Sequence, residues 1–293
     1  MRYIFYALVP LLVLLAVTSS ACVLAYLITW GLDDPSLLRK LIIRISQILL
    51  LLSIYPVMRL LKLSKDDLGI AEKPLFIRQL FKGFGIGLLT LLPIFMVMAI
   101  IGVNVFDDSQ AWSIGLVAKK LAIAFSLAAL IGVVEELVFR GMLLAGLRRN
   151  MPVIVAIILG SIYYAGLHFL DSKSTISPAT FNILTGFQLL SEAYGNVFNS
   201  ENTTAFFALL MVGVFLSVIR TQIKQSIGLC IGCHAAWVWQ IKMSKSLFNT
   251  NPHSEYLSYF NGHSGVLGPL ATVWLLVILL GYFGYKKGFL SAK

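Results

Sequence analysis

Charged residues are scarce in this chain of 293 residues: only 12% are Asp, Glu, Lys or Arg, whereas 58% are hydrophobic. A soluble domain carries about 25% charged residues and about 45–50% apolar ones. The shortage of charge therefore excludes an ordinary soluble protein and indicates an integral membrane protein. Acids are scarcer than bases, with 13 Asp and Glu against 23 Lys and Arg, so the formal net charge is +10.

Basic residues interleaved with surface aromatics, as in a nucleic-acid interface, are missing from the sequence. The bases instead collect in alternate connections between apolar runs, which is the pattern of the positive-inside rule. We therefore expect no nucleic-acid partner, a plasma or inner membrane location, and both termini in the cytoplasm. The basic connections carry Arg59, Lys62, Lys65, Lys73, Arg78 and Lys82, then Arg148 and Arg149, then Arg220 and Lys224, and at the tail Lys286, Lys287 and Lys293. The connection between the first two spans is an exception, since it holds Arg39 and Lys40.

Strict alternation of apolar and polar residues is also missing, which excludes a membrane β-barrel. The apolar runs are instead continuous over about 20 residues, the length that a spanning helix needs. We predict an all-α polytopic membrane protein, a bundle of about eight transmembrane helices. The predicted spans are 4–30, 41–61, 80–105, 116–147, 152–170, 204–219, 226–243 and 265–285.

Three regions follow from this pattern. We expect three N-terminal transmembrane helices in 1–114, a helical core in 115–245, and a loop with a C-terminal transmembrane helix in 246–293. The first apolar run is too long for a cleaved signal peptide. The longest connection, 171–203, contains an apolar cluster that predicts a surface-lying or re-entrant helix.

One apolar run, 121–147, contains the charges Glu135, Glu136 and Arg140. Charges at membrane depth are costly, and by default they indicate a functional site. Glu136 and Arg140 are four residues apart and can pair on one helix face, whereas Glu135 lies one helical step round. A desolvated carboxylate beside a neutralised one is suited to act as a general base. A purely structural ion pair is the alternative, which the second carboxylate disfavours.

Two histidines also lie in predicted membrane helices. His168 follows Tyr164 by four residues and shares its helix face, and His234 lies in a later helix. The three cysteines lie in apolar stretches and say little about a disulfide framework, but Cys230, Cys233 and His234 spell the C-x-x-C-H sequence of c-type haem attachment. The surrounding run is apolar and predicted to be helical, whereas haem attachment needs an accessible loop. We therefore disfavour haem there, and also a zinc site on the same three residues.

The three elements together resemble the CPBP family of intramembrane proteases, the group of CaaX-processing, Rce1-like or Abi proteins. The string Glu-Glu-Leu-Val-Phe-Arg-Gly at 135–141 resembles its first motif, and the spacing of Tyr164 and His168 its second, with Tyr in place of the usual Phe. The segment beginning at His234 resembles the third, but Val238 stands where that family has Asn or Asp.

The resemblance implies hydrolysis of a peptide bond within or beside the membrane. In that reading Glu135 activates a water molecule, His168 and His234 stabilise the oxyanion or share a metal, and Glu136 and Arg140 hold Glu135 in place. The supporting positions are Tyr164, Phe139 and Trp237. Zinc is then possible only through Glu135, His168 and His234, but the sequence lacks H-E-x-x-H, so we prefer a mechanism without a cofactor.

The expected substrate is a membrane protein or peptide with a C-terminal processing signal: a prenylated motif, a membrane-sorting signal or a peptide precursor. Val238 favours one alternative, a catalytically silent scaffold or immunity protein on the same fold. A transporter with a buried ion pair is a second alternative, but no paired broken helices in matching halves support it. The predicted orientation places His168 toward the non-cytoplasmic side, and we expect the site to open there.

Overall fold

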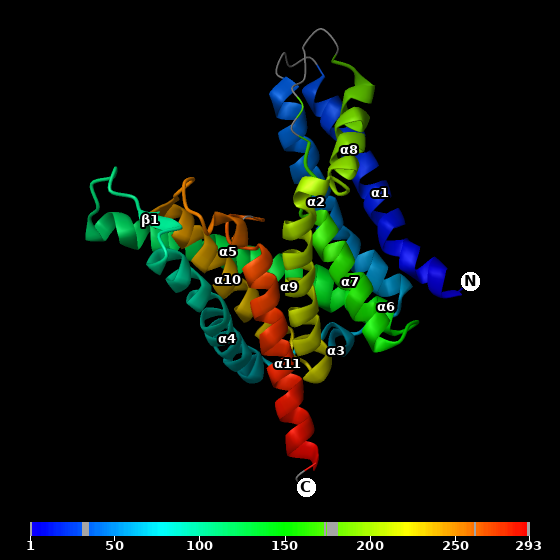
Figure 1. Cartoon of the computed structure of the whole chain (residues 1–293). Coiled ribbons are helices and arrows are strands. Elements are labelled where there is room, and N and C mark those ends of the chain that lie inside the picture. Colours follow the sequence, from blue (N-terminus) through cyan, green and yellow to red (C-terminus); the bar gives the residue numbers. More distant parts are fainter. Residues whose placement is uncertain (1, 31–34, 173, 175–180, 261, 292–293) are drawn as a thin grey trace.

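The computed structural model describes residues 2–30, 35–172, 174, 181–260 and 262–291 and is almost entirely helical (Figure 1). The predicted all-α fold is confirmed. Six helices in the described part of the chain are long and apolar enough to cross a membrane. α7 is apolar but shorter, with 15 residues. The protein is therefore a polytopic membrane helix bundle.

The helices follow the predicted spans, with ends that move by several residues. Their bounds are α1 Arg2–Thr29, α2 Pro35–Leu60, α3 Lys65–Leu68, α4 Lys73–Ile100, α5 Ile114–Glu136, α6 Leu144–Arg148, α7 Val153–Leu167, α8 Ile183–Asn196, α9 Thr203–Gln222, α10 Ile227–Leu247 and α11 Pro269–Ser291. Short 3-10 turns lie at Ser200–Asn202 and Leu257–Tyr259.

The predicted span 80–105 was wrong at its C-terminal end. Helix α4 stops at Ile100, and Gly102 with φ 71° turns the chain away. The next residues form the strand β1, Asn104–Phe106, which pairs antiparallel with β2, Phe248–Thr250. The sequence analysis predicted no strands. This ribbon joins the ends of α4 and α10 through backbone hydrogen bonds.

Helix α8 lies within the 171–203 connection, where a helix was predicted; residues 173 and 175–180 of that connection lie outside the described residues. The Asn182 side chain accepts a hydrogen bond from the Leu184 N–H and caps the N-terminus of α8. Figure 1 shows α8 standing beside α1 and α2, and it contacts both. Its position relative to the lipid surface stays a prediction.

Helix α10 is the most deeply packed helix and lies between α4 and α5. Glycines permit this close approach: a Cβ on Gly83 of α4 would lie 2.1 Å from the Leu229 carbonyl oxygen, and one on Gly232 of α10 would lie 2.1 Å from that of Leu80. Small residues are what lets membrane helices approach closely. The backbone of α10, which carries His234, is therefore held firmly against α4.

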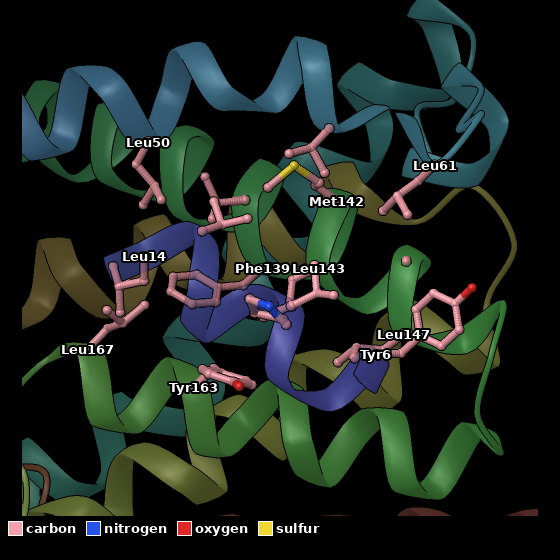
Figure 2. A pocket seen from close by; sticks show the side chains of 16 residues that line it. Tyr6, Leu14, Leu50, Leu61, Phe139, Met142, Leu143, Leu147, Tyr163 and Leu167 are labelled. Atoms are coloured by element: carbon pink, nitrogen blue, oxygen red, sulfur yellow. The ribbon is translucent and has the colours of Figure 1, made fainter. Parts of the chain in front are cut away.

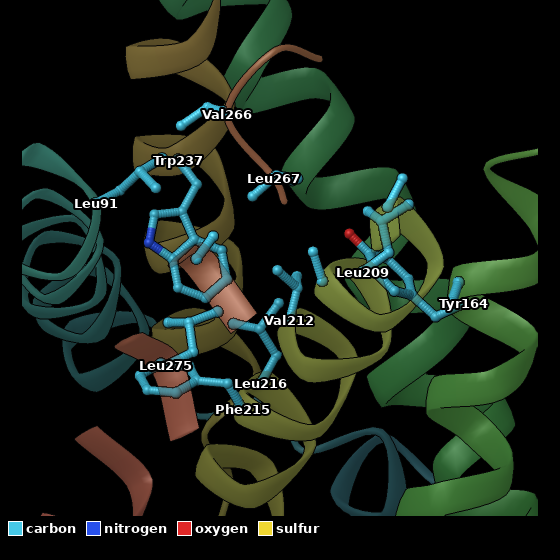
Figure 3. Packing of buried hydrophobic residues seen from close by; sticks show 14 of the residues in the cluster. Leu91, Tyr164, Leu209, Val212, Phe215, Leu216, Trp237, Val266, Leu267 and Leu275 are labelled. Atoms are coloured by element: carbon cyan, nitrogen blue, oxygen red, sulfur yellow. The ribbon is translucent and has the colours of Figure 1, made fainter. Parts of the chain in front are cut away.

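The main hydrophobic core lies between α4, α9, α10 and α11 (Figure 3). Trp237 packs against Phe215, with ring centroids 5.4 Å apart, and its indole N–H donates to the Thr90 hydroxyl. Val266 and Leu267, from the connection before α11, are buried in the same cluster. The core thus fixes both α10 and the loop that precedes α11.

A matched pair of glycines on α4 tests this packing. Gly83→Ala should lower the thermal unfolding midpoint of the detergent-solubilised protein, because the added methyl group meets the Leu229 carbonyl and overpacking costs roughly 1–3 kcal/mol. Gly85→Ala is the control, since its Cβ meets nothing within 4 Å and alanine favours helix. Equal midpoints for the two variants would contradict the α4–α10 packing.

Candidate active site

The two carboxylates lie at the point where α5 ends and a π-helical segment, η1 Leu137–Leu143, begins. The Leu144 N–H bonds to the Phe139 carbonyl five residues earlier, which is the wider π-type turn. The apolar run 121–147 predicted a regular α-helix throughout, and this prediction was wrong for Leu137–Leu143. π-turns inside helices occur frequently at functional sites. Here the widened turn carries Arg140.

Glu136 and Arg140 form a buried pair. The Arg140 guanidinium donates to Glu136 Oε1 at 2.9 Å, and the two side chains are 1% and 0% exposed. His234 Nδ1 reaches the same oxygen at 2.8 Å from α10. A second guanidinium nitrogen donates to the Gly213 carbonyl of α9 at 3.4 Å. The Glu136 carboxylate thus links η1 and α10 directly, and Arg140 extends the network to α9.

Glu135 makes no such bond. Its Oε2 atom is buried and has no hydrogen-bond partner among the described residues. His168 Nε2 lies 4.0 Å away and His234 Nε2 lies 3.8 Å away. These separations are too long for direct hydrogen bonds but match a polar contact through one intervening group. The structure thus brings Glu135, His168 and His234 together from three separate helices.

The other nitrogen of each imidazole is already engaged. His168 Nδ1 lies 2.8 Å from the Tyr164 carbonyl oxygen, which can only accept, so this nitrogen donates. His234 Nδ1 donates in the same way to the Glu136 carboxylate. Each ring therefore directs Nε2 toward Glu135. A histidine oriented through its other nitrogen in this way is the usual arrangement in catalytic and metal sites.

Aromatic residues support this arrangement. Tyr164 packs against His168 with ring centroids 4.6 Å apart, and the Arg140 guanidinium lies 4.3 Å from the centre of the Tyr164 ring. Phe139 packs edge-to-face on Tyr164 at 5.0 Å. Both rings are buried. Tyr164, one predicted supporting position, therefore packs directly against Arg140 and His168, and Phe139, another, packs against Tyr164.

Other candidates from the sequence lie elsewhere. Trp237 belongs to the core and its indole bonds to Thr90, one turn from His234 (Figure 3). Cys230 and Cys233 are fully buried on α10, and the Cys230 thiol donates to the Leu216 carbonyl of α9. Val238 is half-buried one helical turn after His234. Within the described residues, no group of three or more His, Cys, Asp or Glu side chains has the geometry of a metal site.

His263 is a site neighbour that the sequence analysis missed. Its ring packs edge-to-face on His168, with centroids 5.3 Å apart and an interplanar angle of 89°. Its backbone pairs with Leu267 in both directions, at 3.0 Å each, and the left-handed Ser264 and Gly265 close the turn between them. The only sequence signal is rarity, since this is one of four histidines in the chain.

Glu135 and His168 line a cavity of about 580 Å³ between α1, α2, α5, α7 and α8. Its walls are mostly aliphatic, apart from polar residues on α2 and near the end of α7. A second, mostly apolar pocket of about 90 Å³ adjoins it (Figure 2). The two share Leu14, Leu50, Val138, Phe139 and Leu167. The site is therefore reached through a largely apolar space.

Comparison with known proteins gives one finding. Residues 117–240 match the model of a family described as type II CAAX prenyl endopeptidase Rce1-like. The resemblance drawn from the three motifs is thereby confirmed for this segment, which holds Glu135, Glu136, Arg140, His168 and His234. No curated protein and no solved structure matches the chain significantly.

Proposed function

From the Rce1-like match of residues 117–240, we propose that this integral membrane protein is an intramembrane endopeptidase in which Glu135 activates water. One observation carries the proposal. Glu135 Oε2 is buried and unbonded among the described residues, and the Nε2 atoms of His168 and His234 face it at 4.0 and 3.8 Å. Peptide hydrolysis needs a base for water and a donor for the tetrahedral oxyanion, and these groups supply both.

Charge balance assigns the proton within the site. Glu135 and Glu136 are two carboxylates, and Arg140 neutralises only one of them. A buried group of charges is tolerated when it is paired. His234 contacts Glu136 through Nδ1 and faces Glu135 through Nε2, so an imidazolium there balances the second carboxylate. His168 is then neutral, and the lone pair on its Nε2 accepts a hydrogen bond from the attacking water and orients it.

The reaction follows from this assignment. Water attacks the scissile carbonyl carbon while Glu135 takes one of its protons. The carbonyl oxygen becomes an oxyanion, which accepts a hydrogen bond from His234 Nε2–H. When the carbon–nitrogen bond breaks, the leaving amine takes the proton from Glu135, and the other product is a carboxylic acid. Glu136 and Arg140 hold His234 in place throughout and stay outside the proton transfer.

A metal remains the competing version of this site. His168 and His234 both direct Nε2 toward Glu135, and a carboxylate behind His234 is a usual second partner of a zinc-bound histidine. Bonds of 2.0–2.1 Å in a tetrahedron place ligand atoms roughly 3.4 Å apart, somewhat closer than observed here. If zinc binds, Glu135, His168 and His234 hold it, and the metal supplies activation of water.

The substrate is proposed to be a membrane-anchored protein or peptide. The cavity is lined largely by aliphatic side chains, which suits an apolar segment that stays in the bilayer. His168, Asp171 and Ser172, at and just after the C-terminal end of α7, line the cavity, and the charge pattern of the connections assigns that end to the non-cytoplasmic side. A C-terminal sorting signal or precursor fits this side better than a cytoplasmic prenylated motif.

Glu135→Gln is expected to abolish cleavage while the protein still accumulates in the membrane, because the amide keeps the shape but cannot take a proton. The measurement is mass spectrometry of new protein termini in membranes of cells that express each form. Glu201→Gln, an exposed glutamate on a 3-10 turn, is the control and should match the wild type. Wild-type termini in the Glu135→Gln membranes would refute the general-base role.

His263 is proposed as a positioning residue, since it contacts the His168 ring rather than Glu135 directly. His263→Ala should lower kcat about tenfold with little change in KM, because the loss of an aromatic pair worth roughly 0.5–1.5 kcal/mol lets the His168 ring move. His263→Phe keeps the ring contact and should restore most of the rate. The control is His253→Ala, an exposed histidine of the same connection. An unchanged kcat in His263→Ala would contradict the role.

A further inference from the structure

The face of α2 that lines the large cavity carries polar residues within an otherwise apolar wall. Arg39 and Ser46 are seven residues apart, so they lie on the same side of the helix about 10 Å from each other. Ile42 and Leu50 share this side and also line the cavity. Arg39 and Ser46 therefore lie among aliphatic residues on the side of α2 that lines the same cavity as Glu135.

Both residues present buried atoms without partners. In the described part of the chain, Arg39 Nε and Ser46 Oγ are buried and have no hydrogen-bond partner, like Glu135 Oε2. All three residues line the same cavity. A buried polar atom that is left unbonded costs roughly 1–3 kcal/mol. Three such atoms around one space point to a polar ligand that bonds to them when it is present.

The atoms on α2 define the chemistry of that ligand. A guanidinium can only donate hydrogen bonds, and a hydroxyl can donate one. The matching group is an acceptor, and a carboxylate gains charge-assisted bonds to Arg that neutral acceptors do not. Since the rest of the wall is mostly aliphatic, the ligand joins this acceptor to an apolar chain.

The charged groups near Arg39 do not pair with its guanidinium in the described part of the chain. Among the described residues it forms no ion pair, although it lies close enough to help lower the pKa of Glu192 below its ordinary value. Glu192 accepts its own hydrogen bond from the Ser172 hydroxyl at 2.6 Å, and the serine bonds are the main cause of that lowered pKa. Arg44, on the same helix, is bonded to Gln47. Asp171 lines the cavity near the end of α7.

We propose that Arg39 and Ser46 form a subsite for the C-terminal end of an apolar peptide in the cavity that leads to Glu135: Arg39 binds the terminal carboxylate, and Ser46, about 10 Å along α2, bonds to the peptide backbone. This inference rests on the proposed peptidase function and names a feature of its substrate. An apolar segment then lies along α2, with its charged end at Arg39 and its backbone passing Glu135. The subsite selects peptides that end within the cavity over spanning segments that continue beyond it.

Binding tests this without requiring turnover. The full-length Glu135→Gln protein in phosphatidylcholine nanodiscs is titrated with an acetylated apolar hexapeptide that carries either a free carboxylate or a C-terminal amide. We expect the carboxylate form to bind about tenfold more tightly, as one charge-assisted bond permits. Arg39→Gln should remove this preference, whereas Ser46→Ala should weaken the binding of both peptides alike and keep the preference.

Lys40→Gln is the matched control, because it makes the same charge change one residue away on an exposed side chain outside the cavity lining. It should keep the preference. Equal affinities for the two peptides, or equal losses in Arg39→Gln and Lys40→Gln, would overturn the subsite. If phosphatidylglycerol nanodiscs abolish the Arg39-dependent preference, a lipid phosphate fills the subsite and the peptide assignment is wrong. Binding is measured separately from cleavage. If the protein cleaved no peptide, the proposed function would fail, but the measured carboxylate preference would still support the subsite.

Discussion

The structure depends on one constraint: a carboxylate, Glu136, that is completely buried must be neutralised inside the protein. Arg140 and His234 do so by meeting at the same Glu136 oxygen, at 2.9 and 2.8 Å. Removal of one partner of such a buried pair typically costs about 3–5 kcal/mol, so the network also fixes how η1, α10 and α9 meet. Because both bonds go to Glu136 and neither to the adjacent Glu135, Glu135 is the carboxylate proposed to act as the base.

Helix packing positions the two histidines that lie near Glu135. Glycines bring α10 against α4, so His234 arrives at a defined depth and orientation. The end of α7 places His168 opposite, and the buried Val266 and Leu267 hold the turn whose His263 packs on it. The site is thus assembled by packed helices, and the cavity beside α2 that reaches it is lined mostly by aliphatic side chains.

Much of this could be predicted from the sequence, because long apolar runs and the spacing of charges in them reflect simple physical rules. The apolar runs predicted most of the spans. The spacing within 135–141 predicted the Glu136–Arg140 contact, and the motifs at Tyr164–His168 and His234 predicted that two distant histidines lie near Glu135. The π-turn at Leu137–Leu143, the β1–β2 ribbon and His263 could not be predicted, since they depend on tertiary contacts that leave no periodic signal. Catalytic roles, domain limits and the need for a metal stay predictions.

The central claim is that an imidazolium at His234 balances the second carboxylate and leaves Glu135 ionised as the base. Nitrogen-15 NMR of the histidine-labelled protein in nanodiscs reads the protonation of each ring directly, with single substitutions at the four histidines for assignment. The account predicts that His234 is doubly protonated at neutral pH and becomes neutral in Glu135→Gln, where one negative charge is gone. A neutral His234 in the wild type would contradict it.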